Sequence, residues 1–198
     1  MTNLDLAAIV LAGGRAQRMG GEKILAPFAG ATVLDRVLTA CGAAEIIVVG
    51  PPELAAHALA AAARLVREDP PFSGPVAGLR AGLAALPERT TRVVAVLAGD
   101  QPHLDPEGLA DLRRALAQSP MAQAAAYVAD DGHRQFLCAL WREPALRARA
   151  AAAGSSMRSL YAEAAVVDVA DPRGVARDVD TPADLAAARA RRAIPPRG

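Results

Sequence analysis

The chain has 198 residues, of which 53% are hydrophobic, and its formal net charge is +1. This length predicts a single domain with a substantial core, and the near-neutral charge argues against a nucleic-acid-binding protein. The sequence contains neither an apolar run of roughly 20 residues for a membrane span nor a signal peptide, and its two distant cysteines, Cys41 and Cys138, favour a reduced, cytoplasmic chain.

Short apolar runs recur along the chain and are typical of strands buried on both faces of a sheet. In chain order, we expect such buried strands at residues 6–12, 45–50 and 92–98, with a short strand at 64–68 and one more strand at 164–170. Residues 124–129 and 135–141, with a turn at Asp130-Asp131-Gly132 between them, predict two further strands near a sheet edge.

Helix signals alternate with these strands. Thr32 can cap a helix that Gly42 would end, and a second helix is expected over residues 53–63. Pro75 suits the first turn of a third helix, and Asp105-Pro106 opens a fourth that runs to about Gln118. The segment Thr181-Pro182-Ala183-Asp184 has the cap, proline and acid that open a final helix.

The alternation of strands and helices predicts parallel crossovers, so the fold class is α/β. We expect a single domain over residues 1–190, built as a doubly wound, mostly parallel sheet with helices on both faces in the Rossmann-like manner. The segment 191–198 is expected to be a basic, flexible tail.

Three unusual segments follow predicted strands at their carboxyl ends, where a parallel sheet binds its ligands. They are residues 13–23, 68–78 and 99–102, and they contain glycines, cations and aspartates. The convergence of such segments at one edge of the sheet is the strongest physical indication of a ligand site.

The first of these segments, "LAGGRAQRMGGEK", is suited to binding phosphate. It matches neither the P-loop, because Ile24 follows the lysine, nor the Gly-x-Gly-x-x-Gly dinucleotide fingerprint. Its exposed backbone N–H groups can still hold phosphate oxygens, and Arg15, Arg18 and Lys23 can neutralise a triphosphate. The alternative interpretation is an ordinary glycine turn with surface cations.

These motifs resemble those of nucleotidyltransferases that attach a nucleoside monophosphate to a phosphate-bearing acceptor, and the molybdenum cofactor guanylyltransferases in particular. The resemblance covers almost the whole chain and rests on "LAGGRAQRMGGEK", "ED", "GPVAGL", "GDQP" and "DVDTPADL". It implies transfer of GMP from GTP to molybdopterin with release of pyrophosphate. It also implies Mg²⁺ as cofactor and contact with proteins that deliver or receive the molybdenum cofactor.

The resemblance also assigns roles to residues. A nucleotide-binding half of about residues 1–105 would precede an acceptor-binding half of about residues 106–190. Catalysis would depend on Arg15, Arg18, Lys23 and Asp100. The nucleotide would contact Leu11, Ala12, Gly13, Gly14, Lys23, Asp69, Gly74, Gly78 and Asp100. Magnesium would be held by Asp100 with Asp178 or Asp180, and the acceptor by Gln135 and Arg158.

Two departures leave the nucleotide open. Gly50 stands where the guanylyltransferases have an asparagine that contacts nucleotide, and "GDQP" is closer to the loop of the cytidylyl-transferring relative. The "LAGG" motif, in contrast, favours GTP. The alternatives are therefore a cytidylyltransferase acting on the same or a related phosphate acceptor, and a nucleotide-binding accessory protein without catalysis.

Other reactive side chains receive structural interpretations. His57, His103 and His133 stand alone in the sequence and do not predict a metal triad, and Trp141 is expected in the core and not as a platform for a pterin. The acceptor phosphate is already anionic, so the reaction needs no general base.

Overall fold

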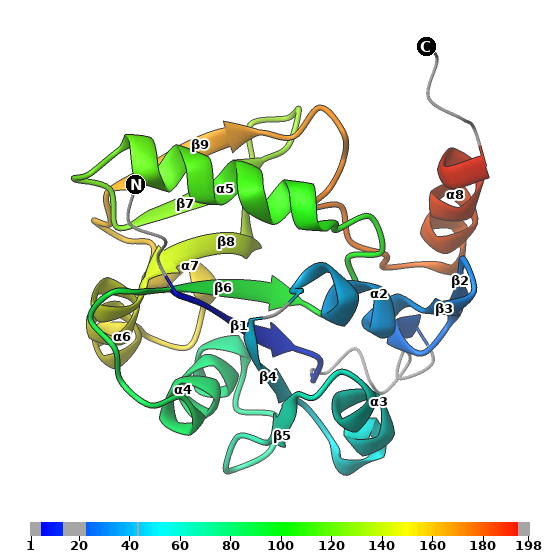
Figure 1. Cartoon of the computed structure of the whole chain (residues 1–198), viewed down its shortest axis with the longest axis horizontal. Helices are drawn as coiled ribbons and strands as arrows, with labels where there is room; N and C mark the ends of the chain where they lie inside the picture. Colours follow the sequence, from blue (N-terminus) through cyan, green and yellow to red (C-terminus); the bar gives the residue numbers. More distant parts are fainter. Residues whose placement is uncertain (1–4, 14–22, 43, 194–198) are drawn as a thin grey trace.

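The computed structural model describes residues 5–13, 23–42 and 44–193, with side chains described as far as Arg191. Its main feature is a seven-stranded sheet with the order β5-β4-β1-β6-β8-β7-β9 (Figure 1). The strands are β1 (Asp5–Leu11), β4 (Glu45–Val49), β5 (Arg64–Val66), β6 (Arg92–Ala98), β7 (Ala124–Val128), β8 (Arg134–Arg142) and β9 (Val166–Ala170).

All neighbouring strands pair in parallel except β8, which is antiparallel to both β6 and β7. The hairpin of β7 and β8 is inserted between β6 and β9, so that β9 forms the edge. The expectation that both hairpin strands lie near an edge therefore holds for β7, which is next to β9. Strand β8 lies further inside, because β9 returns to pair with β7.

Helices cover both faces of the sheet. On one face, α2 (Val33–Ala40), α3 (Ala55–Ala60, after the 3-10 turn Pro52–Leu54) and α5 (Pro106–Gln118) contribute to one apolar cluster. On the other face, α4 (Pro75–Ala85), α6 (Glu143–Ala152) and α7 (Met157–Leu160) contribute to a second. Strand residues alternate between the clusters, as the pleat requires. The predicted doubly wound, mostly parallel α/β fold is confirmed.

The helix starts are set by the caps that the sequence displays. Thr32 and Asp35 form a reciprocal capping box at the start of α2, and Asp105 accepts from the Gly108 N–H at the start of α5. Thr181 and Asp184 bond reciprocally at the start of the last helix, α8 (Pro182–Ala193). Helices α6 and α7 were not predicted from the sequence.

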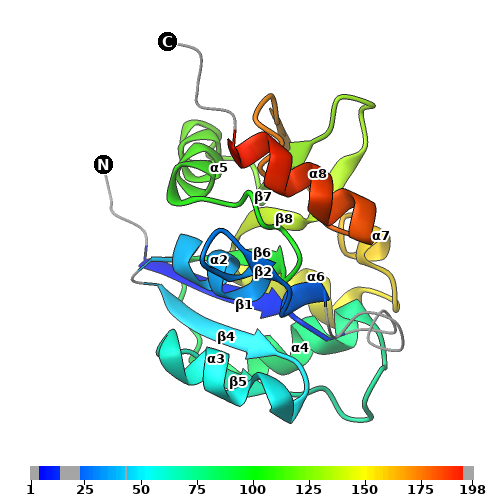
Figure 2. The same ribbon diagram turned by 90° about the vertical axis from the view of Figure 1, so that its right-hand side faces the viewer.

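Helix α8 lies away from the main sheet, against a short hairpin of β2 (Pro27–Phe28) and β3 (Ala31–Thr32) (Figure 2). Phe28 and Val33 pack there with Val179, Leu185 and Ala188. This contact brings the end of the chain back to the segment that follows β1. Helix α8 also continues three residues beyond the predicted domain end at residue 190.

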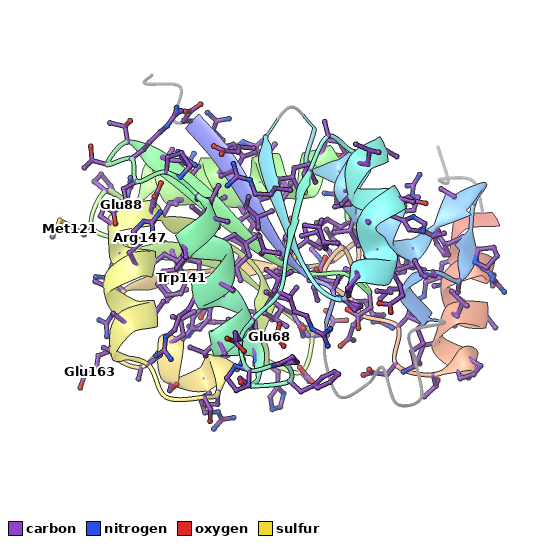
Figure 3. All side chains as sticks on the ribbon, turned by 90° about the horizontal axis from the view of Figure 1, so that it is seen from below. Glu68, Glu88, Met121, Trp141, Arg147 and Glu163 are labelled. Carbon is purple, nitrogen blue, oxygen red and sulfur yellow. The ribbon has the colours of Figure 1, made fainter. Side chains whose placement is uncertain are left out.

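The amino-terminal end of β6 is fixed by a buried ion pair. Arg92 and Glu143 are 2% and 1% exposed, and the Arg92 Nε lies 3.3 Å from a Glu143 carboxylate oxygen. Arg147 also donates to Glu143 and reaches the carbonyls of Leu83 and Leu86 at the end of α4. Figure 3 shows Arg147, on α6, and the core residue Trp141 in the region where α4 and α6 lie side by side. These interactions hold the far end of the sheet, opposite the predicted site.

Candidate nucleotide-binding and catalytic site

The carboxyl ends of the parallel strands are tied together by backbone hydrogen bonds that continue beyond the strands. The Ala12 N–H donates to the Val49 carbonyl at 2.8 Å, and the Gly99 N–H donates to the Leu11 carbonyl at 3.0 Å. A Cβ at Gly99 would lie 3.2 Å from the Cβ of Ala12, so glycine allows these two loops to meet closely. The loops after β1 and β6 therefore form one edge, as the sequence predicted.

A cavity of about 520 Å³ opens at this edge. This volume lies within the range of small-molecule sites. Its described lining comes from the ends of β1 and β4, the segment between β5 and α4, the start of α4, and the loop before α7: Leu11, Gly13, Val49, Glu68, Phe72, Ser73, Gly74, Pro75, Gly78 and Ser155.

Four of the predicted nucleotide contacts line this cavity, namely Leu11, Gly13, Gly74 and Gly78, and Ala12 is buried next to them. Asp69 is exposed and is not among the lining residues, whereas its neighbour Glu68 is. Of the "ED" pair, Glu68 is therefore the carboxylate that lines the cavity.

Gly13 has an ordinary backbone conformation with no positive φ. A Cβ added there would lie 3.5 Å from the Gly50 Cα and 3.7 Å from the Val49 carbonyl oxygen, which are normal contact distances. Among the described residues, nothing opposes an alanine at this position, and a methyl group there would face the cavity that Gly13 lines.

Asp100 has the environment of an unsatisfied carboxylate. It follows β6, and its Oδ1 is buried and accepts no hydrogen bond in the described part of the chain. Burial, together with repulsion from the nearby Asp178 and Asp180, raises the pKa of Asp100 to about 6, whereas Lys23 acts in the opposite direction. The structure thus places Asp100, Asp178, Asp180 and Lys23 within electrostatic reach of one another.

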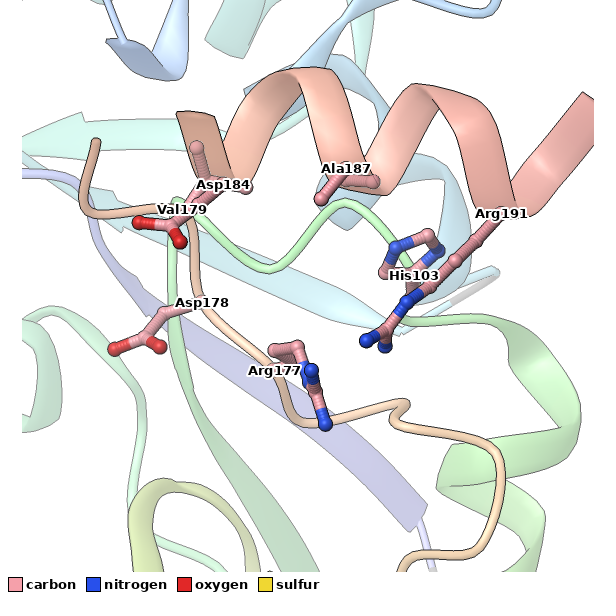
Figure 4. A pocket seen from close by; sticks show the side chains of 8 residues that line it. His103, Arg177, Asp178, Val179, Asp184, Ala187 and Arg191 are labelled. Carbon is pink, nitrogen blue, oxygen red and sulfur yellow. The ribbon is translucent and has the colours of Figure 1, made fainter. Parts of the chain in front are cut away.

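The segment carrying Asp178 is held against the Asp100 loop by its backbone, because the Val179 N–H donates to the Asp100 carbonyl at 3.0 Å. Burial, followed by repulsion from Asp180, raises the pKa of Asp178. Figure 4 shows Asp178 beside a small cavity of about 40 Å³, with Arg177, His103 and Arg191 on its other side.

These carboxylates suit a hard cation. Asp100 and Asp178 both have raised pKa values, and one oxygen of Asp100 has no hydrogen-bond partner among the described residues. A divalent ion bound between them would offset the repulsion between the two carboxylates. Within residues 5–13, 23–42 and 44–193, no three His, Cys, Asp or Glu side chains come together as a complete metal site. Mg²⁺ does not require one, since it commonly takes one or two carboxylates and completes its shell with phosphate oxygens and water.

The predicted acceptor residues occupy separate places. Gln135 lines a second cavity of about 350 Å³ that also includes Asp178 and Asp180, next to the Asp100 loop. Arg158 is exposed on α7 and lines neither the 520 Å³ nor the 350 Å³ cavity. Ser155, just before that helix, lines the 520 Å³ cavity.

The remaining predicted contacts, Gly14, Arg15 and Arg18, lie outside the described residues. Trp141 is fully buried and donates to the Tyr161 hydroxyl at 3.3 Å, so its expected place in the core is confirmed. His57 pairs with Asp35 and His133 with Asp131, at separate positions in the fold.

The family model of the MobA-like NTP transferase domain matches residues 8–169, which include both the edge loops and the β7–β8 hairpin. The chain belongs to this family. A molybdenum cofactor guanylyltransferase of Mesorhizobium japonicum is 37% identical over 144 residues, covering 69% of this chain and 67% of its own. A molybdenum cofactor guanylyltransferase of Rhodobacter capsulatus is 32% identical over 95% of this chain and 97% of its own.

Solved structures of MobA-like and related transferases share the fold. The molybdopterin-guanine dinucleotide biosynthesis protein A of Archaeoglobus fulgidus superposes with a TM-score of 0.71 at 22% identity, covering 94% of this chain and 98% of its own. A 4-diphosphocytidyl-2C-methyl-D-erythritol synthase of Anaerococcus prevotii gives the same TM-score at 16% identity, covering 96% and 99%. At these identities the likeness concerns the fold alone.

One departure within the MobA-like family has a local structural reason. Gly50 is buried, and a Cβ there would lie 2.7 Å from a methyl carbon of Leu54. The two prolines that follow lead directly into the turn that carries Leu54. A side chain at position 50 would therefore require the buried Leu54 side chain, or the turn that carries it, to move.

Proposed function

We propose that this MobA-like nucleotidyltransferase transfers GMP from GTP to the phosphate of molybdopterin and releases pyrophosphate, with Mg²⁺ as cofactor. The two curated relatives with the coverage given above are both guanylyltransferases for the molybdenum cofactor. The observation that carries the proposal is local. A nucleotide-sized cavity lined by Leu11 lies at the same sheet edge as Asp100, whose loop bonds to Leu11 through the Gly99 N–H and whose buried Oδ1 has no partner among the described residues.

In the reaction, an oxygen of the acceptor phosphate attacks the α-phosphorus of GTP, and the bond from that phosphorus to the bridging oxygen of pyrophosphate breaks. The nucleophile carries about 1.5 to 2 negative charges at neutral pH and needs no general base. The main obstacle is repulsion between two anions. The protein lowers it by fixing the reactants in line and by supplying positive charge to the phosphates.

We assign that charge to Lys23 and to Arg15 and Arg18. Asp100, with Asp178 or Asp180, would hold Mg²⁺, which supplies Lewis-acid stabilisation of the phosphate oxygens when bound. The backbone of Leu11, Ala12, Gly13 and Gly14 would bind the nucleotide.

Residues on either side of the edge complete the assignment. Gly74 and Gly78 would line the nucleotide cavity, and Asp69 remains a proposed contact only if its side chain turns toward the ligand. Gln135 fits an acceptor role best, because it lines the cavity that includes Asp178 and Asp180. Arg158 is proposed to approach the acceptor phosphate from α7, and proteins that deliver or receive the cofactor would meet this side.

The second candidate is CTP as the nucleotide, which the "GDQP" loop favours. A panel of GTP, CTP, ATP and UTP with molybdopterin and other phosphate acceptors, read by pyrophosphate release with and without Mg²⁺, tests both. The proposal predicts release with GTP and molybdopterin only when Mg²⁺ is present. Release with CTP alone would assign the cytidylyl reaction, and binding of GTP without release for any acceptor would indicate an accessory protein.

A further inference from the structure

One aromatic side chain of this protein is exposed, and it lies at the nucleotide cavity. The chain has three Phe, two Tyr and one Trp. Phe28, Tyr127, Trp141 and Tyr161 are at most 6% exposed, and Phe136 packs against the core. Phe72, in contrast, is 49% exposed. Because Phe72 also lines the cavity, its exposed ring is available to a ligand bound there.

The backbone holds Phe72 in an uncommon conformation. Its φ is +66°, a region that bulky residues rarely adopt and that is found at ligand clamps when the surroundings enforce it. The surroundings here are specific: a Glu68 carboxylate oxygen accepts from the Phe72 N–H at 3.0 Å, and the Ser73 hydroxyl donates to the Pro70 carbonyl at 2.6 Å. Figure 3 shows Glu68 near the lower centre of the view, well away from Glu88.

Arg67 packs against one face of the Phe72 ring, and Phe72 is the one aromatic residue among the described residues that line the cavity. The guanidinium carbon of Arg67 lies 5.3 Å from the ring centroid, over its face. Among the described lining residues, the others are small, aliphatic or acidic, and three are glycines. The cavity therefore offers one flat π surface beside backbone that carries no side chain, which is how proteins accommodate a planar heterocycle.

We propose that Phe72 stacks on the base of the bound nucleotide, with Arg67 on the outer face of the ring and the base on the inner face. This inference rests on the proposed function, because it places the base of the GTP in the 520 Å³ cavity. The cation polarises the ring, and a purine overlaps it more fully than a pyrimidine does. Phe72 thus contributes to a preference for purine nucleotides without contacting the reacting phosphates.

Calorimetric titration of Phe72 variants tests this role. With GTP, Phe72→Ala is expected to bind about ten-fold more weakly, because loss of a base–aromatic stack has an effect of this order. Phe72→Leu should lose nearly as much, since it keeps apolar bulk without a π face, and Phe72→Tyr should bind like the wild type. Inorganic tripolyphosphate, which has no base, should bind all variants equally. Met121→Ala is the matched control, because Met121 is 89% exposed and lies far from the cavity (Figure 3).

The outcomes separate the two proposals. If the wild type binds GTP and Phe72→Ala and Phe72→Leu bind it equally well, the stacking is wrong while the proposed function stands. Equal weakening of GTP and tripolyphosphate in a folded variant would also overturn the stacking, because it would show that the whole segment moved. A wild type that binds no nucleotide would overturn both.

Discussion

Asp100→Asn is the substitution that separates the catalytic role of this carboxylate from its effect on the fold. The substitution removes the charge and keeps the shape. Burial and the neighbouring aspartates raise the pKa of Asp100 from 3.8 to about 6, so the ionised form destabilises the folded protein. Each pKa unit corresponds to about 1.36 kcal/mol, which sets an upper limit of about 3 kcal/mol. Because Asp100 is partly exposed, screening by solvent reduces this to about 1–2 kcal/mol.

The sign of this effect depends on pH. Below about pH 4, Asp100 is protonated in both the folded and the unfolded protein, and the substitution should leave the free energy of unfolding unchanged. As the pH rises from about 4 to about 6, the unfolded chain ionises Asp100 while the folded protein resists ionising it, so the wild type loses stability; the loss is complete above about pH 6, and the asparagine variant does not show it. Without metal at pH 7.5, the variant should therefore be more stable than the wild type by about 1–2 kcal/mol.

Two measurements check this prediction. Urea unfolding in EDTA at pH 4 and pH 7.5 gives the stability difference, and pyrophosphate release with Mg²⁺ gives the activity, which should fall below detection with the loss of a metal ligand. Addition of Mg²⁺ should stabilise the wild type and not the variant. Equal stability differences at the two pH values would refute the assigned environment of Asp100, and full activity in the folded variant would remove it from the metal role.

The remaining predictions concern four other positions. Lys23→Ala should weaken GTP binding in titrations but leave guanosine binding nearly unchanged, because a point charge acts on phosphate; equal losses would make the lysine structural. Gly13→Ala should keep the wild-type melting temperature and lose GTP affinity more than CTP affinity, by about 1–3 kcal/mol for GTP, and a drop in melting temperature would contradict this. Gly82→Ala should lower the free energy of unfolding by about 1–3 kcal/mol, because its Cβ would lie 2.6 Å from a methyl carbon of the buried Ile9; a melting curve at or above wild type would refute the overlap. Glu143→Gln should lower the free energy of unfolding, measured in urea, by about 3 kcal/mol, because the buried Arg92 loses the charged partner at its Nε. Glu88→Gln, at an exposed glutamate, should leave the free energy of unfolding unchanged.

Local signals in the sequence were sufficient for most elements of this fold. Thr32, Asp105 and Thr181 cap helices through bonds to residues three positions away, and such short-range chemistry is visible in the sequence. The order of the strands depends on pairing between distant segments. The residues of β8 and its neighbours in sequence do not predict that this strand lies between β6 and β7 and is antiparallel to both.

The same limit applies to the candidate site. The glycines and Asp100 could be identified because special residue types follow strand ends. The choice of Glu68 over Asp69 as a cavity residue depends on the path of the loop after β5, and the sequence offers both carboxylates. Phe72 was missed because a lone aromatic residue in a proline-containing loop has no sequence signal; its significance comes from its φ of +66° and its exposure at the cavity.

The transfer of label from [α-³²P]GTP tests the central claim most directly. The protein is incubated with molybdopterin, Mg²⁺ and GTP labelled at either the α- or the γ-phosphate, and the products are separated. The account predicts that α-label appears in a molybdopterin-linked guanine nucleotide, whereas γ-label appears only in pyrophosphate. Incorporation from labelled CTP in preference to GTP, or the absence of α-label from the acceptor while the protein is folded and supplied with Mg²⁺, would contradict it.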